Sequence, residues 1–345
     1  MNYNKSSTKK RINKKDAKST KIKNKVVFTS FKTVLILIAV IVVIVGAAGL
    51  GIAKGIVDSA PDISKIDVVP TGFSTSVLSA DGQEIATLVG EGANRVYVTI
   101  DEIPLHMQQA FIAVEDSRFY EHNGIDPQGI VRAFFVGLSQ GEFNQGASTI
   151  TQQLIKNNVL TTWTGETTFI EKLQRKIQEQ YLAIQLENTL DKDTILEYYL
   201  NTINLGQGAY GIQMASRTYF GKNVSELTIS EAAVLASIPQ SPTNMNPATN
   251  KERNSERRDD VLYKMKRLEF ITPEEYDIAI EDTESVYMRI ATYVAEHSNT
   301  TYFSYFTDEV INQLMNDLQE KLGYSASQIS SLIYTGGLQV FTTQD

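Results

Sequence analysis

The sequence predicts a mainly α-helical protein with one N-terminal transmembrane helix and a short β hairpin. Three observations support this prediction: an uncharged apolar run over residues 33–53, helical periodicity from residue 101 onward, and an Asp81-Gly82 dipeptide between two apolar segments. The 345 residues are 42% hydrophobic and 21% charged, which excludes the wholly disordered, collagenous and coiled-coil classes. This length allows one large domain or two modest ones.

Residues 33–53 are the predicted membrane helix. They carry no charge, and a helix of this length spans about 31 Å, the thickness of a bilayer core. No small-residue cleavage site follows, so the run is interpreted as an uncleaved single-pass anchor in the cell membrane. The alternative is a buried core helix, but core helices seldom run this long without a charge.

The charge distribution predicts the orientation of this anchor. Residues 1–32 hold eleven Lys and Arg against one acid, Asp16, and the rest of the chain holds 21 bases against 39 acids. The basic flank predicts a cytoplasmic tail over residues 1–32, with the acidic remainder on the outer face. Anionic lipid headgroups are the expected partner of the tail, and nucleic acid is not expected as a partner.

The residue types also restrict the chemistry. The sequence has no cysteine and three histidines that do not cluster, which excludes disulfides, thiolate metal sites and a cysteine nucleophile. A metal ion, if used, would need oxygen ligands.

The outer part begins with a polar tether over residues 54–74 that contains Pro61 and Pro70. Asp81-Gly82 supplies the positive φ angles of a tight turn, so a hairpin is predicted around it. Apolar stripes such as Leu173, Ile177, Tyr181 and Ile184 predict helices after residue 101. Further helical patterns cover residues 191–201, 228–238, 255–268, 273–281 and 303–321. The closing YTGGLQVFTTQD alternates like a strand after a Gly-Gly turn.

A first cluster of chemically active residues is EDSRFYEHNGID, which contains Glu115 and Arg118. Glu115 directly follows the apolar stripe of its helix, so the carboxylate is expected to be partly desolvated. Desolvation raises the pKa of a carboxyl, as a general base or acid near neutral pH requires. The alternative is a solvated helix end.

The second and third clusters are polar and basic. NQGASTITQQLIKN offers groups suited to sugar hydroxyls and phosphate oxygens, although a polar N-capped helix start would look the same. RKIQEQYLAIQLE places Arg175 and Lys176 four and three residues before Glu179, on one side of a helix. The pattern fits either an acidic diphosphate with its counter-ion or a simple intrahelical ion pair. The candidate residues of the second cluster are Ser148, Thr149, Gln152, Gln153 and Lys156.

Two more clusters complete the series. An amphipathic ILEYYLN segment leads through three glycines to YFGK, and SEAAVLASIPQSP is an apolar helix ended by prolines. Both are interpreted as packing elements. Together and in this order, the five clusters resemble the five motifs of the family 51 glycosyltransferases, the peptidoglycan polymerase domain of class A penicillin-binding proteins. The resemblance covers roughly residues 75–270.

The resemblance implies a lysozyme-like glycosyltransferase head with a membrane-facing jaw. It also implies a reaction: polymerisation of lipid II into β-1,4 glycan strands with inversion and release of polyprenyl diphosphate. The implied partners are lipid II, the growing glycan strand, the membrane and proteins of the cell-wall synthesis machinery. The implied domains are a glycosyltransferase domain over residues 75–270, then linker helices and the start of an absent transpeptidase region over residues 271–345.

The resemblance also implies roles for the candidates. Glu115 matches the catalytic base, and Glu179 matches a second glutamate that assists diphosphate departure and could hold a divalent cation, Mg²⁺ or Mn²⁺; no organic cofactor is implied. The residues implied to bind substrate are Arg118, Ser148, Thr149, Gln152, Gln153, Lys156, Arg175 and Lys176.

The sequence departs from the family pattern in two places. The stretch NVLTTWTGETTFIEKLQ is longer than in several relatives, and Gln178 stands where some carry a base. The only S-x-x-K matches lie in the basic tail and K-T-G is absent, so no transpeptidase site is expected in these residues. Two alternatives remain open: a lysozyme-like glycan hydrolase and a non-catalytic wall-assembly scaffold.

Overall fold

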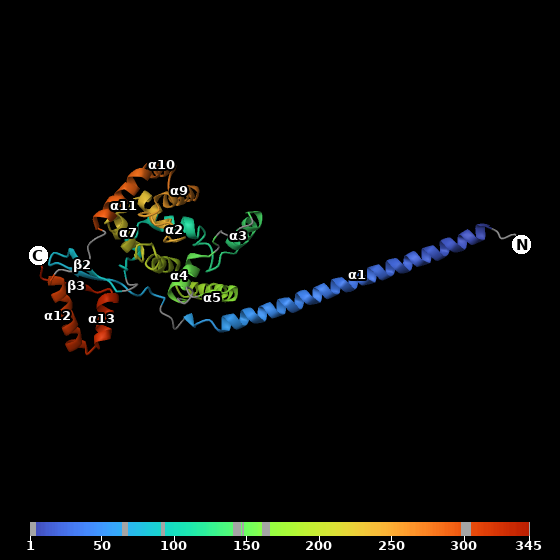
Figure 1. The fold of residues 1–345 in the computed structure, drawn as a ribbon, viewed down its shortest axis with the longest axis horizontal. Helices are drawn as coiled ribbons and strands as arrows, with labels where there is room; N and C mark the ends of the chain where they lie inside the picture. Colours follow the sequence, from blue (N-terminus) through green and yellow to red (C-terminus); the bar gives the residue numbers. More distant parts are fainter. Residues whose placement is uncertain are drawn as a thin grey trace. The chain divides into compact units, whose positions relative to one another are not determined.

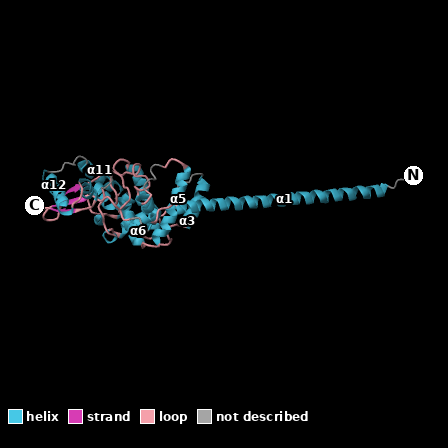
Figure 2. Cartoon of the chain, turned by 90° about the horizontal axis from the view of Figure 1, so that it is seen from below, coloured by secondary structure: helices cyan, strands magenta, loops and turns pink. Residues whose placement is uncertain are grey.

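The computed structural model describes residues 5–63, 68–90, 94–140, 146, 148–160, 166–297 and 305–344. Contacts divide the chain into two units, Met1–Ala60 and Pro61–Asp345. Most of the described residues are helical, and the described strands form one three-stranded sheet (Figures 1 and 2). The predicted mainly α-helical class is therefore confirmed.

The first unit is one helix, α1 (Lys5–Asp58). Its stretch Phe28–Asp58 is the one described segment long and apolar enough to cross a membrane, with a mean hydropathy of 3.0 over its most apolar window. The helix extends beyond the predicted residues 33–53 at both ends, into the basic tail and into the first part of the tether. No proline precedes Pro61, so the sequence contains no strong helix breaker before that point.

The second unit begins with the predicted hairpin. Strands β1 (Thr75–Leu78) and β2 (Glu84–Leu88) pair antiparallel, and Gly82 takes a φ of 85° in the turn between them. The C-terminal strand β3 (Gln339–Phe341) lies parallel to β1, with Val340 opposite Val77. The sheet thus joins the start of the predicted 75–270 domain to the end of the 271–345 segment.

A small core lies under this sheet. Helices α12 (Tyr305–Leu322) and α13 (Ala326–Thr335) supply Ile311, Ile329 and Ile333, which pack against Val77 and Leu88 of the hairpin. The hairpin therefore packs with the C-terminal helices as one layer.

The remaining helices surround the larger core (Figure 1). They are α2 (Leu105–Glu115), α3 (Pro127–Gln140), α4 (Ile150–Asn158), α5 (Phe169–Glu187), α6 (Lys192–Leu200), α7 (Ile212–Phe220), α8 (Ile229–Ala236), α9 (Lys251–Arg267), α10 (Pro273–Glu281) and α11 (Thr283–His297). Phe111 of α2 and Tyr199 of α6 are fully buried and meet edge to face, with ring centroids 6.4 Å apart. Helix α2 packs against α8 and α9, and α4 packs against α5 and α6. A hydrogen bond from Gln153 of α4 to Glu115 of α2 joins these two groups of helices.

Capping boxes fix where several of these helices begin. Thr168 and Glu171 open α5, Thr228 and Glu231 open α8, and α10 and α13 begin in the same way. In each box a side-chain oxygen accepts a backbone N–H that the helix itself cannot satisfy, which typically contributes about 1 kcal/mol.

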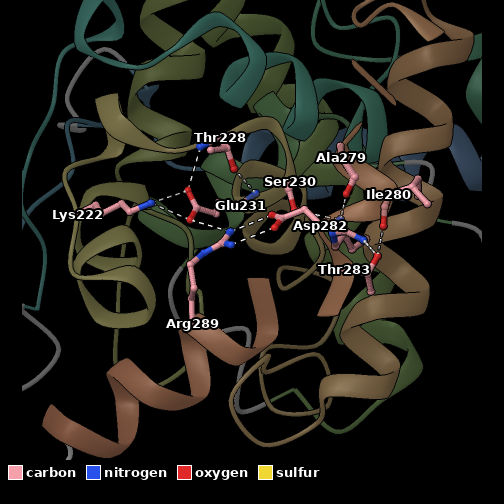
Figure 3. Close-up of polar contacts among 10 residues, drawn as sticks. Lys222, Thr228, Ser230, Glu231, Ala279, Ile280, Asp282, Thr283 and Arg289 are labelled. Carbon is pink, nitrogen blue, oxygen red and sulfur yellow. Dashed lines mark hydrogen bonds and ion pairs between the residues drawn. The ribbon is translucent and has the colours of Figure 1, made fainter. Parts of the chain in front are cut away.

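A buried polar network holds α9 among its neighbours, and its partners on the neighbouring helices, Ser230, Ala279 and Thr283, are labelled in Figure 3. The guanidinium of Arg258 has no exposed surface and donates to Ser230 Oγ at 3.0 Å, to Thr283 Oγ1 at 2.8 Å and to the carbonyl oxygen of Ala279. These partners lie on or beside α8, α10 and α11. These contacts fix α9 relative to α8, α10 and α11. The residues on the rest of α9 therefore have a defined orientation.

Candidate active site

Glu115 is the last residue of α2 and lies at the edge of the core. The side-chain amide of Gln153, on α4, donates to Glu115 Oε2 at 2.8 Å. Tyr199 Oη lies 3.4 Å from Gln153 Oε1 and completes this chain of contacts. Glu115 is thereby held by a neutral hydrogen-bond donor.

Burial raises the pKa of the Glu115 carboxyl, because a desolvated carboxylate is disfavoured relative to the neutral acid. The hydrogen bond from Gln153 and the charges of Arg257, Lys264 and Lys156 act in the opposite direction but do not cancel the effect of burial. The raised pKa of Glu115 agrees with the prediction from the sequence.

A cavity of about 340 Å³ opens beside this residue, between α4 and α5. All of its lining residues are among the candidates that the second and third clusters predicted. They are Ser148, Gln152, Gln153, Lys156, Arg175, Lys176 and Glu179. Because Gln153 both lines the cavity and contacts Glu115, the carboxyl is one hydrogen bond away from the cavity wall.

Glu179 is 1% exposed and pairs with both basic residues of its own helix. Arg175 donates to one carboxylate oxygen, and Lys176 Nζ lies 2.6 Å from the other. Lys176 also donates to Ser148 Oγ at 2.6 Å, which links α5 to the segment before α4. The predicted placement of these three α5 residues on one side of the helix is confirmed.

Two polar side chains, the buried Gln152 and the half-buried Lys156, line the cavity. Gln152 is 1% exposed and donates to the carbonyl oxygen of Gly124 at 3.2 Å, but its Oε1 atom has no hydrogen-bond partner in the described part of the chain. Burial lowers the pKa of Lys156, since the charged ammonium is disfavoured there. A bound anion would offset the cost of burying this ammonium.

The structure does not bring two predicted substrate-binding residues to the cavity. Arg118 pairs with Asp126, a contact within the loop that precedes α3. Thr149 is the N-cap of α4, where it accepts from the Gln152 amide N–H and donates to the Gly124 carbonyl at 2.8 Å. The capping explanation, considered for the second cluster, therefore holds for Thr149.

Sequence reasoning missed three charged residues around the site. Glu166, which precedes α5, accepts two hydrogen bonds from Arg175 Nε, both of 2.9 Å. Arg257 and Lys264 of α9 act on the charge of Glu115, and Asp260 lies 2.7 and 2.9 Å from them respectively. The spacing of Arg257 and Lys264 could have indicated this, because seven residues correspond to two helical turns and place both side chains on one side of the helix.

A second cavity, of about 570 Å³, lies on the α9 side. Its lining includes Arg257 and Asp260, together with polar residues of the segment that follows α8. The full lining is Gln240, Ser241, Asn244, Met245, Arg253, Glu256, Arg257 and Asp260. Glu115 is therefore joined by a hydrogen bond to a residue of the first cavity, Gln153, and Arg257 of the second cavity acts on it through its charge alone.

The donor set does not fit a divalent cation held by the protein at Glu179. Both carboxylate oxygens already accept from Arg175 or Lys176, and the cavity carries three basic side chains that would repel a metal ion. The described residues contain no group of three or more acids or histidines that could hold a metal ion. The expectation that Glu179 holds Mg²⁺ or Mn²⁺ stays a prediction.

Comparison with known proteins finds two similar penicillin-binding proteins. The chain is 42% identical over 267 residues to penicillin-binding protein 1A of Haemophilus influenzae, covering 77% of this chain and 28% of that protein. It is 44% identical over 248 residues to penicillin-binding protein 1A of Escherichia coli K12, covering 72% of this chain and 28% of that protein. The chain thus spans under a third of the length of these relatives.

A crystal structure of penicillin-binding protein 1A from Haemophilus influenzae shares 24% identity over 79% of this chain and 27% of that one. The TM-score of this match is 0.37. The sequence model of the transglycosylase family matches residues 81–266. Because this match covers more than half of the 345 residues, the chain belongs to the transglycosylase family.

Proposed function

We propose that the chain is a peptidoglycan glycosyltransferase that polymerises lipid II into β-1,4 glycan strands with inversion. The observation that carries this proposal is the combination of a desolvated carboxyl at Glu115 with a neighbouring cavity that contains three basic side chains. A sugar hydroxyl needs a base when it attacks, and a departing diphosphate needs positive charge. The family match and the relatives' names support the same assignment.

In the proposed reaction the 4-hydroxyl oxygen of the incoming unit bonds to the anomeric carbon of the growing strand. The bond between that carbon and the diphosphate oxygen breaks, and polyprenyl diphosphate leaves with the electron pair. Glu115 takes the hydroxyl proton, the base half of an inverting mechanism. Its raised pKa makes the carboxylate a stronger acceptor than an ordinary glutamate.

The cavity between α4 and α5 is the proposed diphosphate site. Lys156, Arg175 and Lys176 would stabilise the charge that develops on the leaving group, and Ser148 and Gln152 would hydrogen-bond to it. Diphosphate is a good leaving group once it is compensated in this way, so the mechanism needs no general acid. Glu179 fixes Arg175 and Lys176 and would act as a positioning residue.

The lipid tail of the substrate requires this site to lie near a bilayer. The apolar side chains of α5 at Phe169 and Ile170 are 78% and 74% exposed, and Val131 of α3 is 55% exposed. We assign these surfaces to the membrane-facing jaw. The proposed topology is a cytoplasmic N-terminus, a single span within α1 and a catalytic domain on the outer face.

The test is polymerisation of radiolabelled lipid II by the full chain in detergent, with products separated by gel electrophoresis. We expect long glycan strands from the wild type and from Lys321→Gln, a control lysine that is 71% exposed on α12. Lys176→Gln should give far less polymer, because it removes a charge from the cavity. Release of soluble fragments from purified cell wall, without polymerisation, would instead identify a hydrolase.

A further inference from the structure

The strongest feature outside the proposed reaction steps is a carboxylate placed on a cation of the diphosphate cavity. Glu166 precedes α5 and lies nine residues before Arg175. Both of its carboxylate oxygens accept from Arg175 Nε at 2.9 Å. The side chains are 15% and 19% exposed, so water screens this pair less than an ordinary surface ion pair.

Arg175 is therefore held between two acids. Its Nε edge contacts Glu166, and its NH1 atom contacts Glu179. Guanidinium groups bind phosphate oxygens through the same N–H donors that bind carboxylates. A diphosphate that used the Nε edge of Arg175 would compete directly with Glu166.

The two acids are not equivalent. Glu179 is 1% exposed, belongs to α5 and also pairs with Lys176, so its position is fixed by several contacts. Glu166 lies outside the helix, before the N-cap Thr168. The capping box that starts α5 uses Glu171 and does not involve Glu166. Glu166 can therefore leave Arg175 without disturbing the beginning of α5.

The charge balance of the cavity favours such an exchange. Lys156, Arg175 and Lys176 against Glu179 leave a formal charge of about +2, and Glu166 reduces it to about +1, counting each side chain at its usual charge. A diphosphate that displaced Glu166 would meet the larger positive charge. Without a ligand, Glu166 lowers the cost of keeping three cations close together.

We propose that Glu166 is an internal counter-ion of this cavity, which diphosphate must displace from Arg175 in order to bind. The proposal rests on the proposed function, because it takes the cavity to be the diphosphate site. Glu166 then selects against anions that carry little charge. Only a ligand with more charge than one carboxylate replaces it at little cost.

The test measures binding of inorganic diphosphate to the full chain in detergent by isothermal titration calorimetry. Glu166→Gln keeps the size of the side chain but removes its charge, so diphosphate should bind roughly tenfold more tightly. The matched control is Glu171→Gln. Glu171 is exposed, lies five residues after Glu166 and lines neither cavity, so this change also removes one negative charge. This control should leave the affinity within about twofold of wild type.

A second comparison isolates the route through Arg175. In an Arg175→Gln background, Glu166→Gln should give a gain well below tenfold, because the contact it relieves is already gone and only the general effect of its charge remains. Unchanged or weaker binding by Glu166→Gln, with normal binding by the wild type, would overturn the counter-ion role alone. Absence of diphosphate binding in every variant would overturn the anion cavity, and the lipid II assay would then decide the proposed function separately.

Discussion

Replacing Glu115 by Gln tests the proposed base most directly. The substitution keeps the size of the side chain and still offers Gln153 a carbonyl oxygen to donate to, so the local packing at the end of α2 is preserved. The atom that would accept the hydroxyl proton is lost. General-base catalysis contributes typically 10²- to 10⁴-fold, so we expect the polymerisation rate to fall by about 10²-fold or more.

The dependence on pH provides a second measure of the same residue. Only the ionised Glu115 accepts a proton, so the wild-type rate should rise with pH through the pKa of this carboxyl. Burial places that pKa above the ordinary value of 4.5, so the rise should lie above the usual carboxyl range. The residual activity of Glu115→Gln should lack this rise.

As pH rises, the stability of the fold should fall while the polymerisation rate increases. The pKa of Glu115 is higher in the folded than in the unfolded chain, so ionisation of the buried carboxyl costs stability. This cost grows as pH rises through the folded-state pKa and is complete above it. Glu115→Gln avoids the cost, so its melting temperature should exceed that of wild type at pH 8 more than at pH 4.

The assays are initial rates of lipid II polymerisation between pH 4 and pH 9, and thermal melts over the same range. Glu121→Gln is the control, since it removes an exposed acid six residues away. Near wild-type polymerisation by Glu115→Gln, with a normal rise of rate with pH, would refute the assignment of Glu115 as the base.

Three further predictions follow from other parts of the structure. Glu179→Gln should lower the rate less than Glu115→Gln, about tenfold, because it only loosens Arg175 and Lys176; a more severe loss than that of Glu115→Gln would exchange the two roles. A protein that starts at Pro61 should still float with liposomes, and Phe169→Ser combined with Ile170→Ser should weaken that flotation; a truncated wild type that stays in solution would contradict the apolar jaw. Arg258→Met should destabilise the fold by about 3 kcal/mol in urea unfolding, because it leaves buried polar partners without their donor. The control is Arg217→Met, which breaks a partly exposed pair with Glu84 and should cost less than about 1 kcal/mol. Equal effects of the two changes would count against the buried network.

Much of the fold could be predicted from local signals. The apolar run, the Asp81-Gly82 turn and the helical stripes indicate α1, the hairpin and most of the central helices. Other features lay outside these signals, among them α3 (Pro127–Gln140) and α11 (Thr283–His297), for which no helix was predicted. Helix α13 (Ala326–Thr335) begins with a Ser325 capping box that was not recognised, and the pairing of β1 with β3 joins residues more than 250 positions apart.

The site was predictable where its residues are close in sequence. Both α4 and α5 carry their cavity residues within one or two turns, so the motifs gave every lining residue of the α4–α5 cavity. The charges of Arg257 and Lys264 act on Glu115 because α2 packs against α9, a contact that local periodicity does not encode. Arg118, assigned to substrate by its motif, pairs with the local acid Asp126 and is not among the residues that line this cavity.

The parallel pairing of β1 with β3 has a consequence for how the chain reaches its native state. During synthesis α1 emerges first, and the hairpin follows while its third strand is still more than 250 residues away. Contacts of such sequence separation form slowly, whereas the helical core between the two ends consists largely of nearer contacts. The sheet should therefore be completed last. In a pulse-labelling hydrogen-exchange experiment, the amides of Ser76 and Thr342, which donate across the β1–β3 pair to Leu338 and Leu78, should gain protection after those of α4 and α8.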